Sequence, residues 1–287
     1  MHEFSRIGVV GCGLMGSGIA EICARAGLNV RVVESGDREI EAGMSRINAS
    51  LDRGVRNHKL SETDRAAALK HLTFHTSLTA LADRDLVIEA VAELPDVKRE
   101  IFKELDRIMT ADDAVLASNT SSIPIIDLAA VTKRPLHVLG VHFFNPVPVQ
   151  QLIEIIPTQL TSEHVTQRVA DFASSRLGKT VVRARDRAGF IVNALLVPYL
   201  VSAVRMLESG IASAEDIDNG MVLGCAHPMG PLRLLDLIGL DTAQSIAESM
   251  YEEYKEPPYA PPPLLRRMVA AGTLGRKSGQ GFYVYDR

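Results

Sequence analysis

The feature that most constrains this chain is a G-x-G-x-x-G turn at residues 11–16, placed between an apolar run and a helical stretch. Residues 7–10 predict a buried strand, residues 16–26 space their apolar side chains as a helix does, and residues 30–33 predict a second strand. A strand, a helix and a strand within fewer than about 30 residues form a βαβ unit, which predicts a parallel sheet.

In this context each glycine of the turn has a distinct use. Gly11 makes the tight turn, Gly13 lets the backbone approach a pyrophosphate, and Gly16 lets helix and strand pack closely. The helix that follows, beginning near Leu14 and Met15, offers free N–H groups to phosphates. The turn therefore predicts a dinucleotide site.

An acidic residue, Glu34, follows the second strand. A carboxylate there accepts hydrogen bonds from the adenosine ribose hydroxyls and repels a 2′-phosphate, so NAD is favoured over NADP. A solvated loop acid is the alternative for Glu34. FAD uses the same fingerprint and stays open on this motif alone.

Strands and helices alternate through the first two thirds of the chain, and helices alone follow. We expect helices within 40–70, 96–109 and 165–177, and further strands at 86–91, 115–118, 138–142, 152–156 and 180–182. Beyond residue 187 we expect helices at 190–209, 213–222, 232–254 and 263–271, with a lone strand at 281–285. This order predicts an α/β domain with a doubly wound parallel sheet over 1–186 and an all-helical second domain over 187–287.

A histidine and a glutamate stand in two neighbouring predicted strands. His142 ends the strand 138–142, and Glu154 follows 12 positions later (154 − 142) inside the apolar run 152–156. A carboxylate in such a strand is costly unless it is partnered, and an imidazole is a natural partner that the carboxylate would orient and make more basic. The alternative is a core histidine with Glu154 pointing outward on an edge strand, and spacing alone leaves both open.

A small polar turn, Ser118 to Ser122, follows the strand 115–118. Polar groups at the carboxyl end of a strand can reach a ligand. Taken without further information, the segment is better explained as the N-cap of a helix near Ile126.

Bulk properties exclude several classes of function. The chain is 46% hydrophobic and 23% charged, as in globular proteins, and its net charge of −4 gives no basic surface for nucleic acid. No apolar run approaches the ~20 residues of a membrane helix. Its three cysteines, Cys12, Cys23 and Cys225, form no C-x-x-C, so we expect no metal site, no disulfide framework and a reducing cytoplasm.

Five segments, covering essentially the whole chain in order, resemble the short-chain L-3-hydroxyacyl-CoA dehydrogenase family. They are S-N-T-S-S at 118–122, G-V-H-F-F-N-P-V-P-V at 140–149, G-F-I-V-N-A-L-L-V-P-Y-L at 189–200, P-M-G-P-L-R-L-L-D-L-I-G-L-D at 228–241 and G-R-K-S-G-Q-G-F-Y at 275–283. The bacterial 3-hydroxybutyryl-CoA dehydrogenases are the branch that the chain resembles most.

The resemblance implies a Rossmann domain and a helical domain that forms a homodimer. It implies reversible oxidation of an (S)-3-hydroxyacyl-CoA to the 3-ketoacyl-CoA, with hydride passing to NAD⁺. His142 would be the general base and Glu154 its orienting partner, while Ser121 and Asn193 would hydrogen-bond substrate oxygens. The cofactor side would be formed by Gly11, Gly13, Gly16, Glu34, Glu93, Lys98, Ser121, Asn145 and Lys277.

The chain departs from the family pattern at two places. Glu34 stands where many relatives have Asp, and it is long enough to serve the same hydroxyls. The family holds the CoA nucleotide with a Ser and a Lys after the second strand. Ser50 fits, but the Lys position is Asn57, so Lys59 or the neighbouring Arg53 and Arg56 become candidates for a CoA phosphate. A solvated helix face is the alternative for these residues.

Two other functions remain as alternatives. An enzyme that oxidises a sugar acid such as L-gulonate shares the H-F-F-N-P segment, and a non-catalytic, crystallin-like NAD-binding protein shares the scaffold. The complete set Ser121, His142, Glu154 and Asn193 argues against a pure binder. The nearly continuous apolar run 194–204 predicts a homodimer joined through residues 189–287, because a helix that is apolar all round must be covered on every side.

Overall fold

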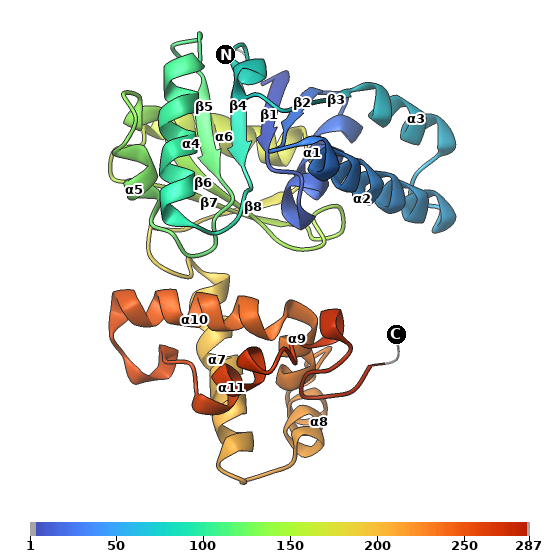
Figure 1. Cartoon of the computed structure of the whole chain (residues 1–287), viewed down its shortest axis with the longest axis vertical. Coiled ribbons are helices and arrows are strands. Elements are labelled where there is room, and N and C mark those ends of the chain that lie inside the picture. The colour runs from blue at the N-terminus through green and yellow to red at the C-terminus, as the bar shows by residue number, and fades with distance from the viewer. Residues whose placement is uncertain (1–3, 286–287) are drawn as a thin grey trace. The chain divides into compact units, whose positions relative to one another are not determined.

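A computed structural model describes residues 4–285, which divide at Asp186 into a first and a second unit (Figure 1). None of the helices within residues 4–285 is both long and apolar enough to cross a membrane.

The first unit is built on an eight-stranded sheet in the order β3-β2-β1-β4-β5-β6-β7-β8. The strands are β1 (Arg6–Val10), β2 (Asn29–Val33), β3 (Leu72–His75), β4 (Leu86–Glu89), β5 (Val115–Ser118), β6 (Val138–Phe143), β7 (Leu152–Pro157) and β8 (Thr180–Arg183). Every neighbouring pair is parallel except β6 with β7. The mostly parallel sheet confirms the predicted α/β fold class.

Helices cover this sheet on both faces. They are α1 (Leu14–Arg25), α2 (Asp37–Arg56), α3 (Glu62–Lys70), α4 (Pro95–Ile108), α5 (Ile125–Ala129) and α6 (Glu163–Ser175). Helices α1, α2, α3 and α6 share one apolar core with the strands, while α5 packs on α4 and on β6. Because both faces are covered, the central strands β4 and β5 are buried at every residue, as parallel strands usually are.

The antiparallel pairing of β6 with β7 follows from the link between them. Residues 144–151 contain no helix, and a parallel return needs a crossover of about a dozen residues or more. The chain therefore turns back as a hairpin, and the register places His142 directly opposite Glu154. This one exception to the parallel sheet brings the two residues together.

The second unit is helical. Its helices are α7 (Val192–Glu208), α8 (Ala214–Cys225), α9 (Pro231–Ile238), α10 (Leu240–Tyr254) and α11 (Pro263–Ala270). A core of buried leucines joins these helices: Leu200, Leu232, Leu235, Leu240 and Leu265.

Three expectations were wrong in detail. Strand β3 was not predicted, because its apolar residues Leu72 and Phe74 form no continuous run, whereas the equally exposed edge strand β8 contains Val181 and Val182 in succession. The single helix expected over 232–254 is two helices, because Gly239 adopts φ +101°, a left-handed value that breaks the helix. Residues 281–285 form an isolated bridge in place of a strand, since the N–H groups of Phe282 and Tyr283 donate to Asp236.

Candidate active site

The glycine turn after β1 has the close contacts that a phosphate loop needs. Gly11 adopts φ +90°, and a Cβ atom on it would lie 2.7 Å from the carbonyl oxygen of Ala90. A Cβ atom on Gly16 would lie 1.9 Å from the carbonyl oxygen of Gly11, so only glycine lets α1 start here. At Gly13 a Cβ atom would meet nothing within 4 Å, which leaves open space beside the backbone at the start of α1.

A cavity of about 530 Å³ adjoins this turn. Gly11, Gly13 and Glu34 line it together with apolar side chains from the segment after β4 and from α4: Val91, Leu94, Val97 and Ile101. Glu34 accepts hydrogen bonds from the backbone N–H groups of Cys12 and Ser35. Apolar walls beside a carboxylate and a glycine turn fit an adenosine and its pyrophosphate.

Cys12, in this turn, and Cys23, in α1, are both unreactive. Cys12 and Cys23 are fully buried. Burial raises the pKa of the Cys12 thiol to about 12, and the neighbouring Glu34 carboxylate adds to the effect. Burial alone raises the pKa of Cys23 to about 12. Neither thiol is a nucleophile near neutral pH.

His142 and Glu154 form a buried pair. His142 is 4% exposed and Glu154 is fully buried, and Nδ1 of the ring lies 2.6 Å from Oε2 of the carboxylate. The alternative that Glu154 points outward on an edge is wrong, because β7 lies between β6 and β8. With its Nδ1–H donated to Glu154, the ring presents the lone pair of Nε2, which lies 3.2 Å from the hydroxyl oxygen of Ser121.

The polar turn that carries Ser121 is organised by Glu93. One oxygen of this carboxylate, Oε1, accepts hydrogen bonds from four groups: the Thr120 hydroxyl, the Ser121 N–H, the Ser122 N–H and the Ser122 hydroxyl. Burial raises the pKa of Glu93, but the Lys98 cation and the hydrogen bonds from Thr120 and Ser121 lower it more, so its pKa lies below the ordinary value. Glu93 therefore holds the turn as an anion.

The interpretation of this turn as a helix N-cap is wrong. Helix α5 begins at Ile125, and its first N–H groups, from Ile125 and Ile126, both donate to Asp186 at 2.8 Å. The turn is instead tied to β6, because Oδ1 of Asn119 accepts the N–H of Phe143 at 2.9 Å. The ends of β5 and β6 are thus fixed to each other beside His142.

The other predicted residues have varied surroundings. In the first unit, Leu14 and Asn145 are exposed, Met15 is half-buried, and Lys98 is buried, with Nζ 2.6 Å from Glu89 and 3.1 Å from Glu93. In the second unit, Asn193 is the second residue of α7, and Lys277 pairs with Asp241 at 2.5 Å.

Glu89 was missed by the sequence analysis. Its signal was available, because it is an acid inside the apolar run 86–91, as Glu154 is inside the run 152–156. The structure places it at the end of β4, fully buried.

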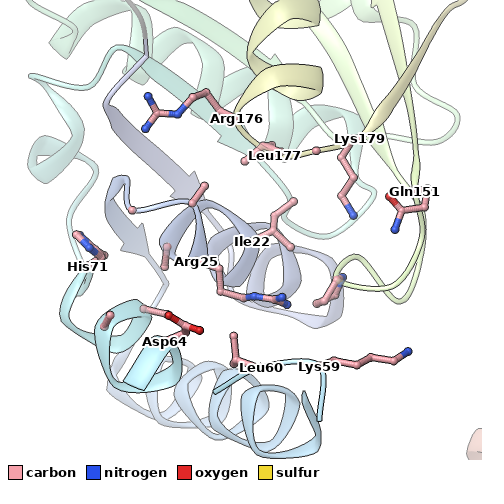
Figure 2. A pocket seen from close by; sticks show the side chains of 17 residues that line it. Ile22, Arg25, Lys59, Leu60, Asp64, His71, Gln151, Arg176, Leu177 and Lys179 are labelled. Atoms are coloured by element: carbon pink, nitrogen blue, oxygen red, sulfur yellow. The ribbon is translucent and has the colours of Figure 1, made fainter. Parts of the chain in front are cut away.

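A second cavity, of about 540 Å³, is lined by basic side chains from three parts of the first unit (Figure 2). They are Arg25 on α1, Lys59 after α2, and Arg176 and Lys179 between α6 and β8, with Asp64 as the acid among the lining residues. Lys179 is 8% exposed, and its Nζ donates to the carbonyl oxygens of Val147 and Gln150. Burial, aided by Arg25, lowers the pKa of Lys179.

This cavity and the buried pair share the loop 144–151, which starts after β6 and contributes Pro148 and Gln151 to the cavity wall. Of the two predicted CoA contacts, Lys59 lines the cavity. Ser50, on α2, does not line it.

The chain matches two family models that together span both units. Residues 6–187 match the 3-hydroxyacyl-CoA dehydrogenase, NAD binding domain, and residues 189–285 match the 3-hydroxyacyl-CoA dehydrogenase, C-terminal domain. Among curated proteins, it is 61% identical over 280 residues to a 3-hydroxybutyryl-CoA dehydrogenase of Mycobacterium tuberculosis, covering 98% of each chain.

Two solved structures have the same fold. The crystal structure of M. tuberculosis FadB2 superimposes with a TM-score of 0.98 at 60% identity, covering 99% of this chain and 100% of that one. The (S)-3-hydroxybutyryl-CoA dehydrogenase PaaH1 of Ralstonia eutropha superimposes with a TM-score of 0.93 at 45% identity, with the same coverage. From these matches and the site described above, the chain belongs to the 3-hydroxyacyl-CoA dehydrogenase family of NAD-dependent oxidoreductases.

Proposed function

We propose that the protein catalyses the reversible oxidation of (S)-3-hydroxybutyryl-CoA to acetoacetyl-CoA, with NAD⁺ as the hydride acceptor. The observation that carries this proposal is the line of contacts from Glu154 through His142 to Ser121, with 2.6 Å and 3.2 Å between the paired atoms. The names of the two similar dehydrogenases supply the substrate class.

The chemistry requires one base and one hydride acceptor. As the alcohol is oxidised, Nε2 of His142 takes the hydroxyl proton, and Glu154 stabilises the positive charge that the ring acquires. Bound NAD⁺ supplies the hydride acceptor for the same carbon. Ser121 and, from the second unit, Asn193 would hydrogen-bond the substrate oxygens. In the reverse direction the protonated ring returns the proton to the ketone oxygen.

We also propose where the nucleotide end of CoA binds. CoA carries a pyrophosphate and a 3′-phosphate, and the second cavity presents Arg25, Lys59, Arg176 and Lys179 (Figure 2). Guanidinium and ammonium groups are the usual partners of phosphate oxygens. The loop 144–151, which joins this cavity to the buried pair, supports one ligand reaching both places. Ser50, which does not line this cavity, would have a lesser role than Lys59.

A homodimer remains part of the proposal. Leu195 on α7 is 74% exposed and Leu223 on α8 is 83% exposed in the single chain. Large apolar side chains exposed to this degree favour cover by a second copy through residues 189–287, since most oligomers are symmetric dimers. Light scattering at micromolar concentration tests this, and a mass near 31.2 kDa would show a monomer. A cytoplasmic location stays a prediction from the cysteine content.

The reaction is tested by following NADH absorbance with acetoacetyl-CoA as substrate. We expect rapid NADH oxidation, and no NAD⁺ reduction with L-gulonate. Turnover of gulonate would instead identify the protein as a sugar-acid dehydrogenase. Tight NADH binding without turnover of either compound would identify it as a non-catalytic NAD-binding protein.

A further inference from the structure

A buried ion pair between Glu89 and Lys98 lies behind the candidate active site, and the proposed mechanism does not use it. Glu89 is fully buried at the end of β4, Lys98 in α4 is 1% exposed, and Lys98 Nζ lies 2.6 Å from Glu89 Oε1. Burying a carboxylate and an ammonium group costs free energy, whereas burying two nonpolar side chains in their place would not. The buried position of this ion pair therefore calls for an explanation.

The two residues are linked to the turn 118–122 in different ways: Glu89 directly, and Lys98 through Glu93. Oε2 of Glu89 accepts the hydroxyl of Ser118 at 2.6 Å, and that hydroxyl oxygen accepts the N–H of Thr120 at 3.2 Å. On the other route, Lys98 Nζ lies 3.1 Å from Oε2 of Glu93. This contact leaves Oε1 of Glu93 to accept its four hydrogen bonds from the turn, including the N–H of Ser121 at 2.9 Å.

We propose that Lys98 and Glu89 are positioning residues for the reaction proposed above, on which this inference rests. Lys98 neutralises and orients Glu93, Glu93 fixes the backbone of Ser121, and Ser121 is thereby held at Nε2 of His142. Glu89 holds Lys98 in place and fixes the start of the same turn through Ser118. The family resemblance implies that Lys98 binds the cofactor, whereas this proposal has Lys98 position the hydroxyl of Ser121.

The charges explain why a cation is needed at this point. Glu89 and Glu93 both approach Lys98, so the ammonium group separates two carboxylates. Without it the carboxylates would repel each other, and the pair would relieve the repulsion by binding a proton or moving apart. Movement of Glu93 would release the turn, and a small displacement of a catalytic group can cost up to about 10²-fold in rate.

The experiment compares Lys98→Met with Lys103→Met. Lys103 lies on the same helix and pairs with Glu100 at 2.7 Å, but this pair is exposed. For Lys98→Met we expect kcat with acetoacetyl-CoA to fall about tenfold or more, with the KM for NADH changed less than about threefold. Lys103→Met should stay within about twofold of the wild type in both.

The pH dependence separates positioning from mere support of the fold. The ratio of Lys98→Met kcat to wild-type kcat should rise as the pH falls, because a proton bound between the two carboxylates replaces the missing cation. The double variant Glu89→Gln with Lys98→Met removes one charge of each sign. It should recover kcat relative to Lys98→Met and lose that pH dependence.

Three results would overturn the inference. They are a Lys98→Met variant with wild-type kcat, one whose only defect is weak NADH binding, and a double variant worse than the single one. Circular dichroism checks that each variant is folded, and Lys98→Gln replaces Lys98→Met if the latter is not. An inactive wild type would refute the proposed function instead, so the two failures are distinguishable.

Discussion

The two units of the molecule both bury carboxylates, but they surround them differently. In the first unit Glu154 is fully buried against the ring of His142. In the second unit Asp218 and Asp236, 3% and 1% exposed, accept hydrogen bonds chiefly from backbone N–H groups. Equal burial therefore has two uses: in the proposed mechanism Glu154 supports acid–base chemistry, whereas Asp218 and Asp236 accept backbone N–H groups and hold segments of the chain together.

The second unit shows the structural use in detail. Asp218 accepts the N–H groups of Leu232 and Arg233 at the start of α9, where a carboxylate also faces the positive end of the helix. Asp236 accepts the N–H groups of Phe282 and Tyr283 and the hydroxyl of Tyr285. Asp218 therefore ties α8 to α9, and Asp236 ties the C-terminal segment to α9.

The largest expected effect lies at the titratable partner. His142→Gln should keep NADH binding but lose about 10²–10⁴-fold in kcat, the usual value of a positioned acid–base group. Steady-state kinetics with acetoacetyl-CoA and fluorescence titration with NADH measure the two quantities. A variant with near-wild-type kcat would show that His142 is a core histidine. Glu154 would then be a structural carboxylate, like those of the second unit.

On the structural side, Asp236→Ala should destabilise the protein without involving acid–base chemistry. It leaves three donors without their acceptor, and we expect a loss of about 3–5 kcal/mol in the free energy of unfolding. Urea denaturation followed by circular dichroism gives this value. A variant as stable as the wild type would show that Asp236 does not anchor the C-terminal segment.

Glu154→Gln tests the chemical role of a buried carboxylate directly. We expect kcat to fall about tenfold, since an amide aligns the ring less well and gives no charge to the protonated form. Because the protonated ring loses its counter-charge, the pH profile of kcat should move to lower pH in both directions of the reaction. An unchanged profile, measured between pH 5 and pH 9 (roughly the range in which histidine titrates), would make Glu154 structural, like Asp236.

Glu34 combines both uses, since it accepts the N–H of Cys12 and also lines the cavity beside the glycine turn, where we propose that NAD binds. Wild-type protein should prefer NADH over NADPH, because a 2′-phosphate would face this carboxylate. Glu34→Ala should narrow the preference by about tenfold, the effect of roughly one lost charge contact. Kinetics with both cofactors measure it, and equal use of NADPH by the wild type would contradict the assignment of Glu34.

The sequence marks the buried acids of the first unit more clearly than those of the second unit. Glu154 is conspicuous because it interrupts an apolar strand, and Glu89 is comparable but was included in a run extended to Val91. Asp218 and Asp236 lie in amphipathic helical stretches where an acid is ordinary. The donors that identify their role come from distant positions, 14 residues on for Asp218 and 46 for Asp236.

The same limit applies to the fold. Periodicity predicted the strands that contain continuous apolar runs, including the half-exposed edge strand β8. It did not predict β3, where Leu72 and Phe74 form no continuous run, nor the break at Gly239, where the positive φ depends on the path of the chain on either side. The antiparallel direction of β7 could have been predicted only from the shortness of the link 144–151 that precedes it.

That hairpin makes the proposed acid–base pair a local product of folding. His142 and Glu154 meet by closing a short loop, whose entropy cost is small compared with that of bringing distant strands together. The arrangement has a corresponding weakness, since a slip of one residue in the pairing would turn Glu154 to the opposite face of the sheet. An insertion or deletion within 144–151 that shifted the register would therefore abolish the pair outright, while the rest of the sheet kept its order.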